Sequence, residues 1–201
     1  MPQITVEPVG LLETNCYLVF VESSKRLYII DPGADPDVVV NDAMKYDFDE
    51  AVILLTHAHV DHIGAVANIA EKLKVKQVYL HKNGRELYKS PDNHLMPYVQ
   101  RAENLPEVTQ KVSEPDFEII ETPGHTPGGV CFYFKDISAL FVGDTLFAGS
   151  VGRTDLPGGN SATLVRSIRE KLMTLPEDLK VYPGHGPAST IGREKKGNPF
   201  I

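Results

Sequence analysis

Long apolar runs, an excess of basic residues and a set of paired cysteines are all missing from this chain of 201 residues. The longest apolar runs, at 51–55 and 139–142, are far shorter than the ~20 residues that a membrane-spanning helix needs. The opening sequence MPQITVEPVG has neither the basic stretch nor the apolar core of an export signal. We therefore expect a soluble protein that is not exported and has no membrane partner.

The small number of basic residues argues against a nucleic-acid partner. Lysine and arginine total 20 against 27 aspartates and glutamates, which gives a formal net charge of −7. Proteins that bind nucleic acids carry basic patches that neutralise phosphates. We therefore expect no nucleic-acid partner, and the sequence does not fix the oligomeric state.

Only two cysteines occur, Cys16 and Cys131, and each lies inside an apolar run that resembles a strand. Two isolated cysteines in such runs are typical of buried free thiols in a reducing compartment, and they do not form a disulfide framework. We expect a cytoplasmic protein.

Turn residues separate runs that are rich in β-branched and aromatic residues, which predicts nine strands, at about 3–7, 16–21, 26–30, 51–55, 77–80, 117–121, 129–134, 138–142 and 180–182. Apolar periodicity predicts helices at about 35–45, 63–74, 83–90, 95–104 and 161–174, the last with Asn160 or Ser161 as N-cap. Strands and helices alternate after residue 31, whereas the start and 117–142 resemble antiparallel meanders. We expect an α/β (α+β) fold of mixed sheets covered by helices, in a single domain over 1–201.

The stretch 82–115 is polar and contains four prolines. It is typical of a surface excursion of helix and loop, and a lid over a substrate is the alternative interpretation.

The strongest chemical signal is the segment THAHVDH, which begins at Thr56 and directly follows the apolar run AVILL. It places four potential metal ligands, His57, His59, Asp61 and His62, within six residues. Residues two apart do not share a helical face, whereas at the end of an extended strand the first three can point to one side. A following helix would turn His62 to a second position. The pattern predicts a metal site.

Three further strand ends carry imidazole or carboxylate groups: His125 in ETPGHTPGG, Asp144 in FVGDTLF and His185 in YPGHGPAS. If these ends meet at one side of the sheets, they form a site built from loops on a rigid scaffold. Histidine and carboxylate ligands without thiolates suit zinc, and also iron or manganese. Seven ligands are too many for one four-coordinate ion and suit two ions that share a carboxylate.

These motifs resemble the metallo-β-lactamase superfamily, and within it glyoxalase II (hydroxyacylglutathione hydrolase) and its short bacterial relatives. The resemblance extends over nearly the whole chain, including GDTLFAGSVGRTDLPGG and the terminal GREKKGNPFI. It implies a four-layer αββα sandwich of two mixed sheets with two Zn²⁺ ions at one edge. By position, the first ion would be bound by His57, His59 and His125, the second by Asp61, His62 and His185, and Asp144 would bridge them.

Two departures limit what the resemblance implies. Typical β-lactamases of the superfamily lack an acid at the bridging position, so Asp144 argues against β-lactam hydrolysis. Full-length glyoxalase II continues into a helical domain that supplies much of its glutathione contact, and this sequence ends at Ile201, where that domain would begin. The resemblance therefore implies the metal chemistry and does not specify the thiol partner. Arg153 falls where the family places a basic residue near glutathione, and a solvent-facing loop arginine is the equal alternative.

Charge and leaving-group chemistry favour a thioester substrate. Two divalent ions with Asp61, Asp144 and a bridging hydroxide keep about one positive charge for the oxyanion that forms when hydroxide attacks a carbonyl. A thiolate, whose conjugate acid has a pKa near 8.5, leaves without a proton donor, whereas an amide nitrogen needs one. The sequence offers no obvious donor other than Asp61. We expect a dinuclear hydrolase of hydroxyacyl thioesters such as lactoylglutathione, with Asp61 and Asp144 as catalytic residues.

The main alternative is a persulfide dioxygenase of the same fold, which would bind one iron through His57, His125 and Asp144. The PGHG motif around His185 favours the hydrolase. A metal-dependent binding or redox-sensing module is a third reading that no feature of the sequence requires.

Overall fold

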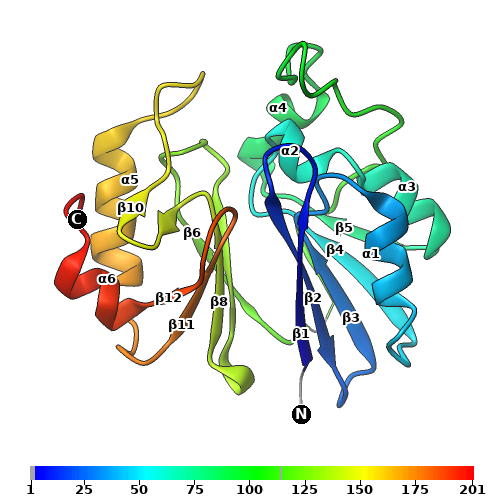
Figure 1. Cartoon of the computed structure of the whole chain (residues 1–201), viewed down its shortest axis with the longest axis horizontal. Helices are drawn as coiled ribbons and strands as arrows, with labels where there is room; N and C mark the ends of the chain where they lie inside the picture. The colour runs from blue at the N-terminus through cyan, green and yellow to red at the C-terminus, as the bar shows by residue number, and fades with distance from the viewer. Residues whose placement is uncertain (1–2, 114) are drawn as a thin grey trace. The chain divides into compact units, whose positions relative to one another are not determined.

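The computed structural model describes residues 3–113 and 115–201, which form two compact units. Unit 1 is Met1–Asp116 and unit 2 is Phe117–Ile201. Each unit contains a five-stranded mixed sheet with helices packed on it (Figure 1).

The sheet of unit 1 has the order β1-β2-β3-β4-β5. Its first three strands are antiparallel, whereas β3, β4 and β5 run parallel. The strands are β1 Gln3–Val9, β2 Thr14–Val21, β3 Arg26–Ile30, β4 Glu50–Leu54 and β5 Gln77–Tyr79. The helices are α1 Pro36–Ala43, α2 Val60–Ile63, α3 Val66–Lys72, the 3-10 turn η1 Lys82–Gly84 and α4 Arg85–Lys89.

Alternate residues of these strands bury one sheet face against α1 and α3. Leu18, Leu27 and Ile53 point to this face and are inaccessible to solvent, as are Val39 of α1 and Ile69 of α3. Fully burying a side chain of this size contributes about 1.5–3 kcal/mol. The apolar stripes of the two helices therefore fix the sheet from which the motif at 56–62 extends.

The sheet of unit 2 has the order β12-β11-β8-β7-β6. Parallel pairing occurs between β8 and β11, and the other pairs are antiparallel. The strands are β6 Glu118–Glu121, β7 Val130–Phe134, β8 Ala139–Gly143, β11 Lys180–Pro183 and β12 Ser189–Thr190, and a separate hairpin joins β9 Leu146–Phe147 to β10 Ser150–Val151. The helical segments are the 3-10 turn η2 Lys135–Ile137, α5 Ser161–Ser167, the π-helical turn η3 Ile168–Leu172 and α6 Ile191–Gly197.

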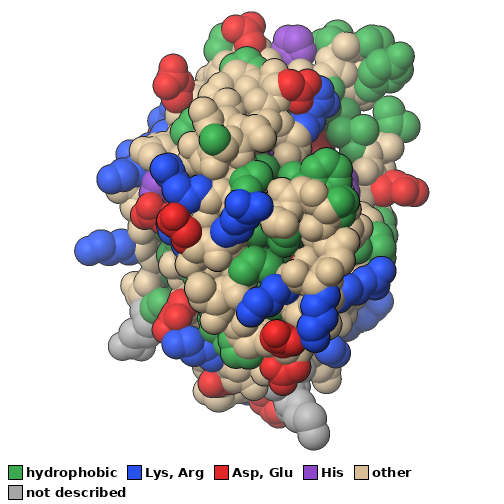
Figure 2. All heavy atoms as spheres, turned by 90° about the vertical axis from the view of Figure 1, so that its left-hand side faces the viewer, with side chains coloured by type: hydrophobic (Ala, Val, Ile, Leu, Met, Phe, Trp, Pro, Cys, Tyr) green, Lys and Arg blue, Asp and Glu red, His purple; other side chains and the backbone are tan. Residues whose placement is uncertain are grey.

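The helices α5 and α6 and the turn η3 cover one face of this second sheet. Leu164, Ile168 and Ile191 pack into a buried cluster with Leu140 of β8 and Val181 of β11. On the face of the molecule that carries these helices, acidic and basic side chains are interspersed (Figure 2). No patch of one charge sign dominates that face.

Strand direction places the candidate site residues of each unit at one sheet edge. In unit 1, Ile30 pairs with Leu54 in a parallel register, so the segments after β3 and β4 emerge together. In unit 2, Phe141 pairs with Tyr182 in parallel, so the segments after β8 and β11 also emerge together. The loop 122–129 connects β6 to β7 at this same edge, because β7 runs antiparallel to β8.

All nine expected strands are present, within two residues at each end. The Asn160 N-cap of α5 is also confirmed, because its side chain accepts a hydrogen bond from the Thr163 amide over 2.8 Å. The sequence did not predict the short strands β9, β10 and β12 or the helix α6, which are too short for a periodic signal.

The helix expected at 63–74 is divided into α2 and α3. A Cβ at Gly64 would lie 2.3 Å from the carbonyl oxygen of Gly33, and the amide of Ala65 donates to the carbonyl of Pro32 over 3.0 Å. Close packing against the segment after β3 therefore interrupts the helix at this point. The helix α2 begins at Val60, three residues earlier than expected. Asp61 therefore lies on a helix, and the expectation that it extends from the end of a strand is wrong.

The prediction of a helix at 95–104 is wrong, because the structure has a turn there. The amides of Tyr98 and Val99 donate to the carbonyl of Leu95, and the Leu95 amide donates back to Val99, which forms a closed turn. Leu95, Met96 and Tyr98 are exposed, so no buried face supports a helix there. Proline at 97 also removes an amide donor.

Both cysteines are buried free thiols, as expected. Across residues 3–113 and 115–201, no helix is long and apolar enough to cross a membrane.

Candidate metal centre

Unit 1 brings together the four candidate ligands of the THAHVDH segment, which we call the unit 1 cluster: His57, His59, Asp61 and His62. The ring of His57 lies 4.9 Å from that of His59 and 4.1 Å from that of His62, measured between centroids. His62 Nε2 lies 3.5 Å from an oxygen of Asp61. His57 and His62 are buried, whereas His59 and Asp61 are partly exposed. The segment therefore forms one cluster, as its spacing indicates.

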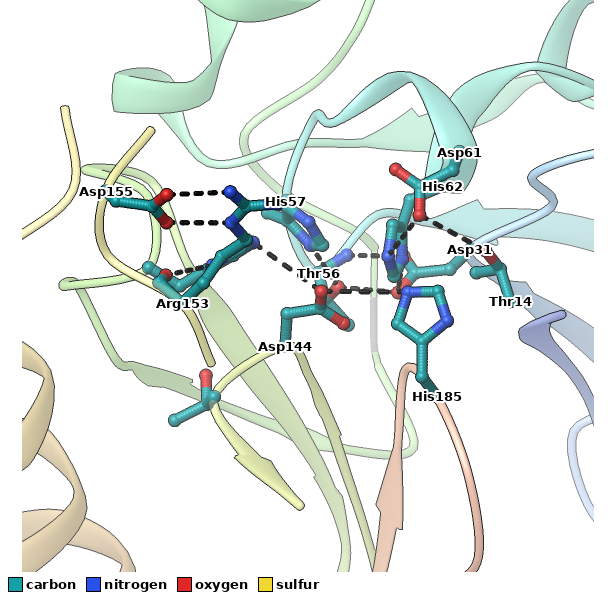
Figure 3. A network of polar contacts seen from close by, with 12 residues as sticks. Thr14, Asp31, Thr56, His57, Asp61, His62, Asp144, Arg153, Asp155 and His185 are labelled. Carbon is teal, nitrogen blue, oxygen red and sulfur yellow. Dashed lines mark hydrogen bonds and ion pairs between the residues drawn. The ribbon is translucent and has the colours of Figure 1, made fainter. Parts of the chain in front are cut away.

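A buried aspartate that follows β3, Asp31, organises this cluster (Figure 3). It accepts hydrogen bonds from the amide of Thr56 over 2.8 Å and from the Thr56 hydroxyl over 2.5 Å. Its Oδ2 also lies 3.0 Å from Nδ1 of His62. Nitrogens of His57 and His62 and an oxygen of Asp31 all lie within 4.8 Å of one another. Because both Asp31 oxygens already accept these bonds, we interpret Asp31 as a residue that orients His62.

These hydrogen bonds determine which ring nitrogen of each histidine carries its proton. A carboxylate only accepts, so His62 Nδ1 must donate to Asp31. Thr56 donates its single hydroxyl proton to Asp31, so its oxygen accepts from Nδ1 of His57, 3.0 Å away. Both neutral imidazoles then present Nε2 as the basic nitrogen, which is the arrangement found for metal-binding histidines.

Two further contacts hold the unit 1 cluster in place. The Thr14 hydroxyl donates to Asp61 Oδ2 over 3.3 Å. The buried side chain of Asn93 donates from Nδ2 to the carbonyl of Ala58 over 2.7 Å and to that of Leu87 over 3.1 Å. The excursion at 82–115 is thereby attached to the backbone between His57 and His59.

Unit 2 brings together the other three candidates, which we call the unit 2 cluster: His125, Asp144 and His185. Asp144 Oδ2 lies 3.6 Å from His125 Nε2 and 3.7 Å from His185 Nε2. The Asp144 carboxylate therefore lies between two imidazoles, as a bridging carboxylate would. Nδ1 of His125 donates to the backbone carbonyl of Arg153 over 2.7 Å, so its proton is on Nδ1 and Nε2 is basic.

The Arg153 side chain pairs with Asp155, whereas its backbone carbonyl bonds to His125 of the unit 2 cluster. Its guanidinium makes two hydrogen bonds of 2.7 Å to Asp155, and the side chain is 62% exposed. This pair raises the pKa of Arg153 and, mainly through the hydrogen bonds from Arg153, lowers the pKa of Asp155 to about 2. The exposed guanidinium is accessible to a ligand as well as to solvent.

The distances between imidazole and carboxylate groups fit a bound cation. The three such pairs between candidate ligands lie 3.5, 3.6 and 3.7 Å apart, which is longer than an ordinary hydrogen bond of about 2.9 Å. Two ligands about 2.1 Å from one tetrahedral ion lie roughly 3.4 Å apart. In the pairs of Asp61 with His62 and of Asp144 with His125, a basic Nε2 faces a carboxylate, an arrangement that a positive ion stabilises. The donors present therefore fit zinc, iron or manganese.

Sequence reasoning missed Asp31, Thr56 as a hydrogen-bonding residue and the carbonyl of Arg153. Asp31 had a usable signal, because it follows the strand 26–30 next to the strand that leads into the metal motif. No sequence signal marks the Arg153 carbonyl as an acceptor, because every residue carries a backbone carbonyl. The chain brings it to His125 only by folding the β9–β10 hairpin.

A cavity of about 200 Å³ opens beside Asp61 in unit 1. Asp61, Thr14 and Gln100 supply its polar side chains, and Leu11, Leu12 and Tyr98 are among its apolar lining residues. The last three are exposed, Leu11 by 69% and Tyr98 by 75%. An apolar rim next to a candidate ligand is typical of a small-molecule site.

Comparison with known proteins places these features in one family. The family model described as "Metallo-beta-lactamase superfamily" matches residues 9–185. Hydroxyacylglutathione hydrolase GloC of Haemophilus influenzae is 34% identical over an alignment of 212 positions, which covers 98% of this chain and 97% of that protein.

Solved structures agree. TTHA1623 in a di-iron-bound form has a TM-score of 0.88 at 37% identity, covering 98% of this chain and all of that one. BLEG-1, described as a B3 metallo-β-lactamase, has a TM-score of 0.86 at 36% identity and covers 98% and 99% of the two chains. The chain belongs to the metallo-β-lactamase superfamily, and the expected fold class is confirmed.

Proposed function

We propose that the chain is a dinuclear metal-dependent hydrolase that cleaves a hydroxyacyl thioester such as lactoylglutathione. His57, His59 and His125 would bind one ion, Asp61, His62 and His185 the second, and Asp144 would bridge them. Membership of the superfamily and the similarity to GloC support this assignment. The similarity to a di-iron protein supports two metal ions but leaves zinc and iron both open. A single domain over 1–201, a cytoplasmic location and the absence of nucleic-acid and membrane partners remain part of the proposal.

The observation that carries the proposal is the position of Asp144. One of its oxygens lies within 3.7 Å of imidazoles from two different loops, and the proton of His125 is held on Nδ1 by the Arg153 carbonyl. A structural ion pair would need a protonated imidazole at a normal hydrogen-bond distance. The longer spacing between Asp144 and the imidazoles, together with the basic Nε2 of His125, is the arrangement expected when these groups bind a common cation.

Each residue contributes to the chemistry through the charge or proton that it holds. Ions bound here would lower the pKa of a coordinated water and polarise the substrate carbonyl. Asp61 and Asp144 supply two negative charges that balance half of the charge of two divalent ions. The Thr14 hydroxyl holds Asp61, and Asp31 with Thr56 keeps the histidine protons on Nδ1. The chain thereby fixes the ligands before substrate binds, which reduces the reorganisation needed for reaction.

The leaving group favours a thioester. A thiolate departs without protonation, whereas an amine must receive a proton. Asp61 is the one candidate donor in the unit 1 cluster, and it already accepts a hydrogen bond from Thr14. We propose that the apolar rim beside Asp61 accepts a nonpolar part of the substrate, and that Arg153 binds a carboxylate of its thiol portion.

The test begins with purification without added metal, elemental analysis, and assays on lactoylglutathione, glutathione persulfide and a β-lactam. Two metal ions per chain and thioester hydrolysis are expected. Asp144→Asn and His59→Ala should abolish hydrolysis and keep a cooperative thermal transition, while Lys45→Ala, an exposed residue of unit 1, should leave activity unchanged.

Other outcomes would contradict the proposal. One iron per chain with oxygen consumption on the persulfide would favour a dioxygenase. Hydrolysis of the β-lactam alone would favour a β-lactamase similar to BLEG-1. It would also show that an aspartate at position 144 is compatible with that substrate. Near-normal thioesterase activity in Asp144→Asn would exclude the dinuclear arrangement.

A further inference from the structure

The terminal motif GREKKGNPFI contains a buried carboxylate that the proposed chemistry does not use. Glu194 lies on α6 and is 1% exposed. It accepts hydrogen bonds from the amide of Gly149 over 2.8 Å, from Nδ2 of Asn198 over 2.9 Å and from the hydroxyl of Ser189. Nδ2 of Asn198 also donates to the carbonyl of Ser150 over 2.9 Å. Glu194 and Asn198 therefore hold the tip of the β9–β10 hairpin.

That hairpin connects two elements of the unit 2 cluster. Its first strand begins two residues after Asp144, and its second strand ends two residues before Arg153. The amide of Gly152 donates to the carbonyl of Thr145 over 3.3 Å, which closes the base of the hairpin. The carbonyl of Arg153 then accepts from Nδ1 of His125. Movement of the hairpin would therefore move both Asp144 and the group that orients His125.

The third member of the unit 2 cluster is connected to the same hairpin. The ring of Phe147 on β9 packs edge-on against His185, with 6.4 Å between centroids. Ser189, which donates to Glu194, follows His185 by four residues and begins β12. One carboxylate thus holds the hairpin on one side and the loop of His185 on the other.

We propose that Glu194, assisted by Asn198, is a positioning residue that sets the geometry of His125, Asp144 and His185 for metal binding. The inference rests on the proposed function. Stability alone is a weak reason for a carboxylate at this place, because a well-packed apolar residue of similar size often stabilises a buried position as well or better. A carboxylate can instead accept from three donors on three different segments and fix them at defined distances.

The experiment compares zinc affinity, measured by competition with a chromophoric chelator, with the melting temperature of each metal-free variant. Glu194→Leu removes all three hydrogen bonds at similar volume, and we expect zinc to bind about tenfold more weakly or worse. Glu194→Gln can keep them, because its amide oxygen accepts from Gly149 and Asn198 while its nitrogen donates to Ser189, and its affinity should stay near that of the wild type. Asn198→Ala loses the bond to Ser150 and should weaken zinc binding in the same direction.

A matched control separates positioning from stability. Thr190 caps α6 by accepting from the amide of Arg193 over 3.2 Å, so its hydroxyl stabilises the helix that carries Glu194 and not the hairpin. Thr190→Ala should lower the melting temperature and leave zinc affinity unchanged. In Co²⁺-loaded protein, the visible absorption spectrum should change in Glu194→Leu and be retained in Glu194→Gln.

The outcomes distinguish the inference from the function on which it rests. A wild-type chain that binds no metal would overturn both. If the wild type binds two ions and Glu194→Leu binds them equally tightly with the same Co²⁺ spectrum, only the inference is wrong. It is also wrong if Thr190→Ala, at an equal loss in melting temperature, loses as much affinity as Glu194→Leu. If Glu194→Leu does not fold, unchanged affinity and spectrum in Asn198→Ala would overturn it.

Discussion

Gly152 packs directly against the backbone of Asp144. A Cβ built at position 152 would lie 1.8 Å from the carbonyl oxygen of Asp144 and 3.4 Å from the Cβ of His125. Asp61, the other candidate catalytic aspartate, also packs against a glycine. A Cβ built at Gly33 would lie 1.6 Å from the carbonyl oxygen of Asp61. In each case a glycine permits an approach that no other residue allows.

Gly152→Ala should therefore displace the backbone at Asp144. We expect the free energy of unfolding, measured by urea denaturation, to fall by about 1–3 kcal/mol, the usual cost of forcing extra volume into a packed site. Zinc affinity should fall with it. Gly197→Ala is the control, because nothing lies within 4 Å of a Cβ at that position and the backbone is not in the left-handed region. Equal stability of the two variants would contradict the packing argument.

Asp31→Asn should weaken metal binding although it hardly changes the volume of the side chain. The new amide nitrogen would face Thr56 or His62, where a proton acceptor is needed, and would favour the imidazole tautomer with its proton on Nε2. We expect zinc affinity to fall about 10–100-fold, as for other outer hydrogen-bond partners of metal ligands. Asp47→Asn makes the same charge change at a side chain that is 95% exposed, and it should bind zinc like the wild type. Chelator competition on both variants measures the difference.

The Asp155 carboxyl should titrate with a pKa of about 2, which NMR can follow through its side-chain carbon. Its ordinary pKa is about 3.9, and the two hydrogen bonds from Arg153 favour the charged form. Because the folded-state pKa is depressed, the interaction is complete above about pH 4 and is lost as the pH falls towards 2. Arg153→Ala should return the pKa of Asp155 towards 3.9. An unchanged titration in that variant would show that the pair does not form in solution.

Tyr98→Ala should raise the KM for thioesters with a nonpolar acyl or thiol group and change kcat little. Tyr98 lines the cavity beside Asp61 without belonging to the unit 1 cluster, so its removal subtracts binding and not chemistry. Met44→Ala removes a comparably exposed apolar side chain after α1, outside this cavity, and should leave both constants unchanged. A fall in kcat at constant KM would place Tyr98 in a different role.

The strands and the ligand clusters within each unit could be predicted from the sequence for one shared reason. Buried strands such as 51–55 are apolar and short, and small or polar residues follow each of them. The histidines and aspartates after these strands therefore stand out, and chain direction collects them at one sheet edge.

The features that sequence reasoning missed depend on contacts between distant segments. The break between α2 and α3 depends on Gly33 meeting Gly64, which no local pattern encodes. The helix expected at 95–104 failed because its apolar residues have no surface to cover, although their spacing suggested one. The bonds of Glu194 and Asn198, which connect the hairpin of β9 and β10 to the helix α6, join residues more than forty apart.

The hydrogen bond from Asn93 to the Ala58 carbonyl couples the motion of the polar excursion at 82–115 to that of the histidine motif. Each local opening of the segment around Asn93 must release the Ala58 carbonyl, so the backbone between His57 and His59 loosens at the same moment. Amide hydrogen exchange in the two segments should therefore proceed at correlated rates. Inserting residues between Leu87 and Asn93 would alter ligand geometry from a distance, even though that stretch contains none of the seven candidate ligands.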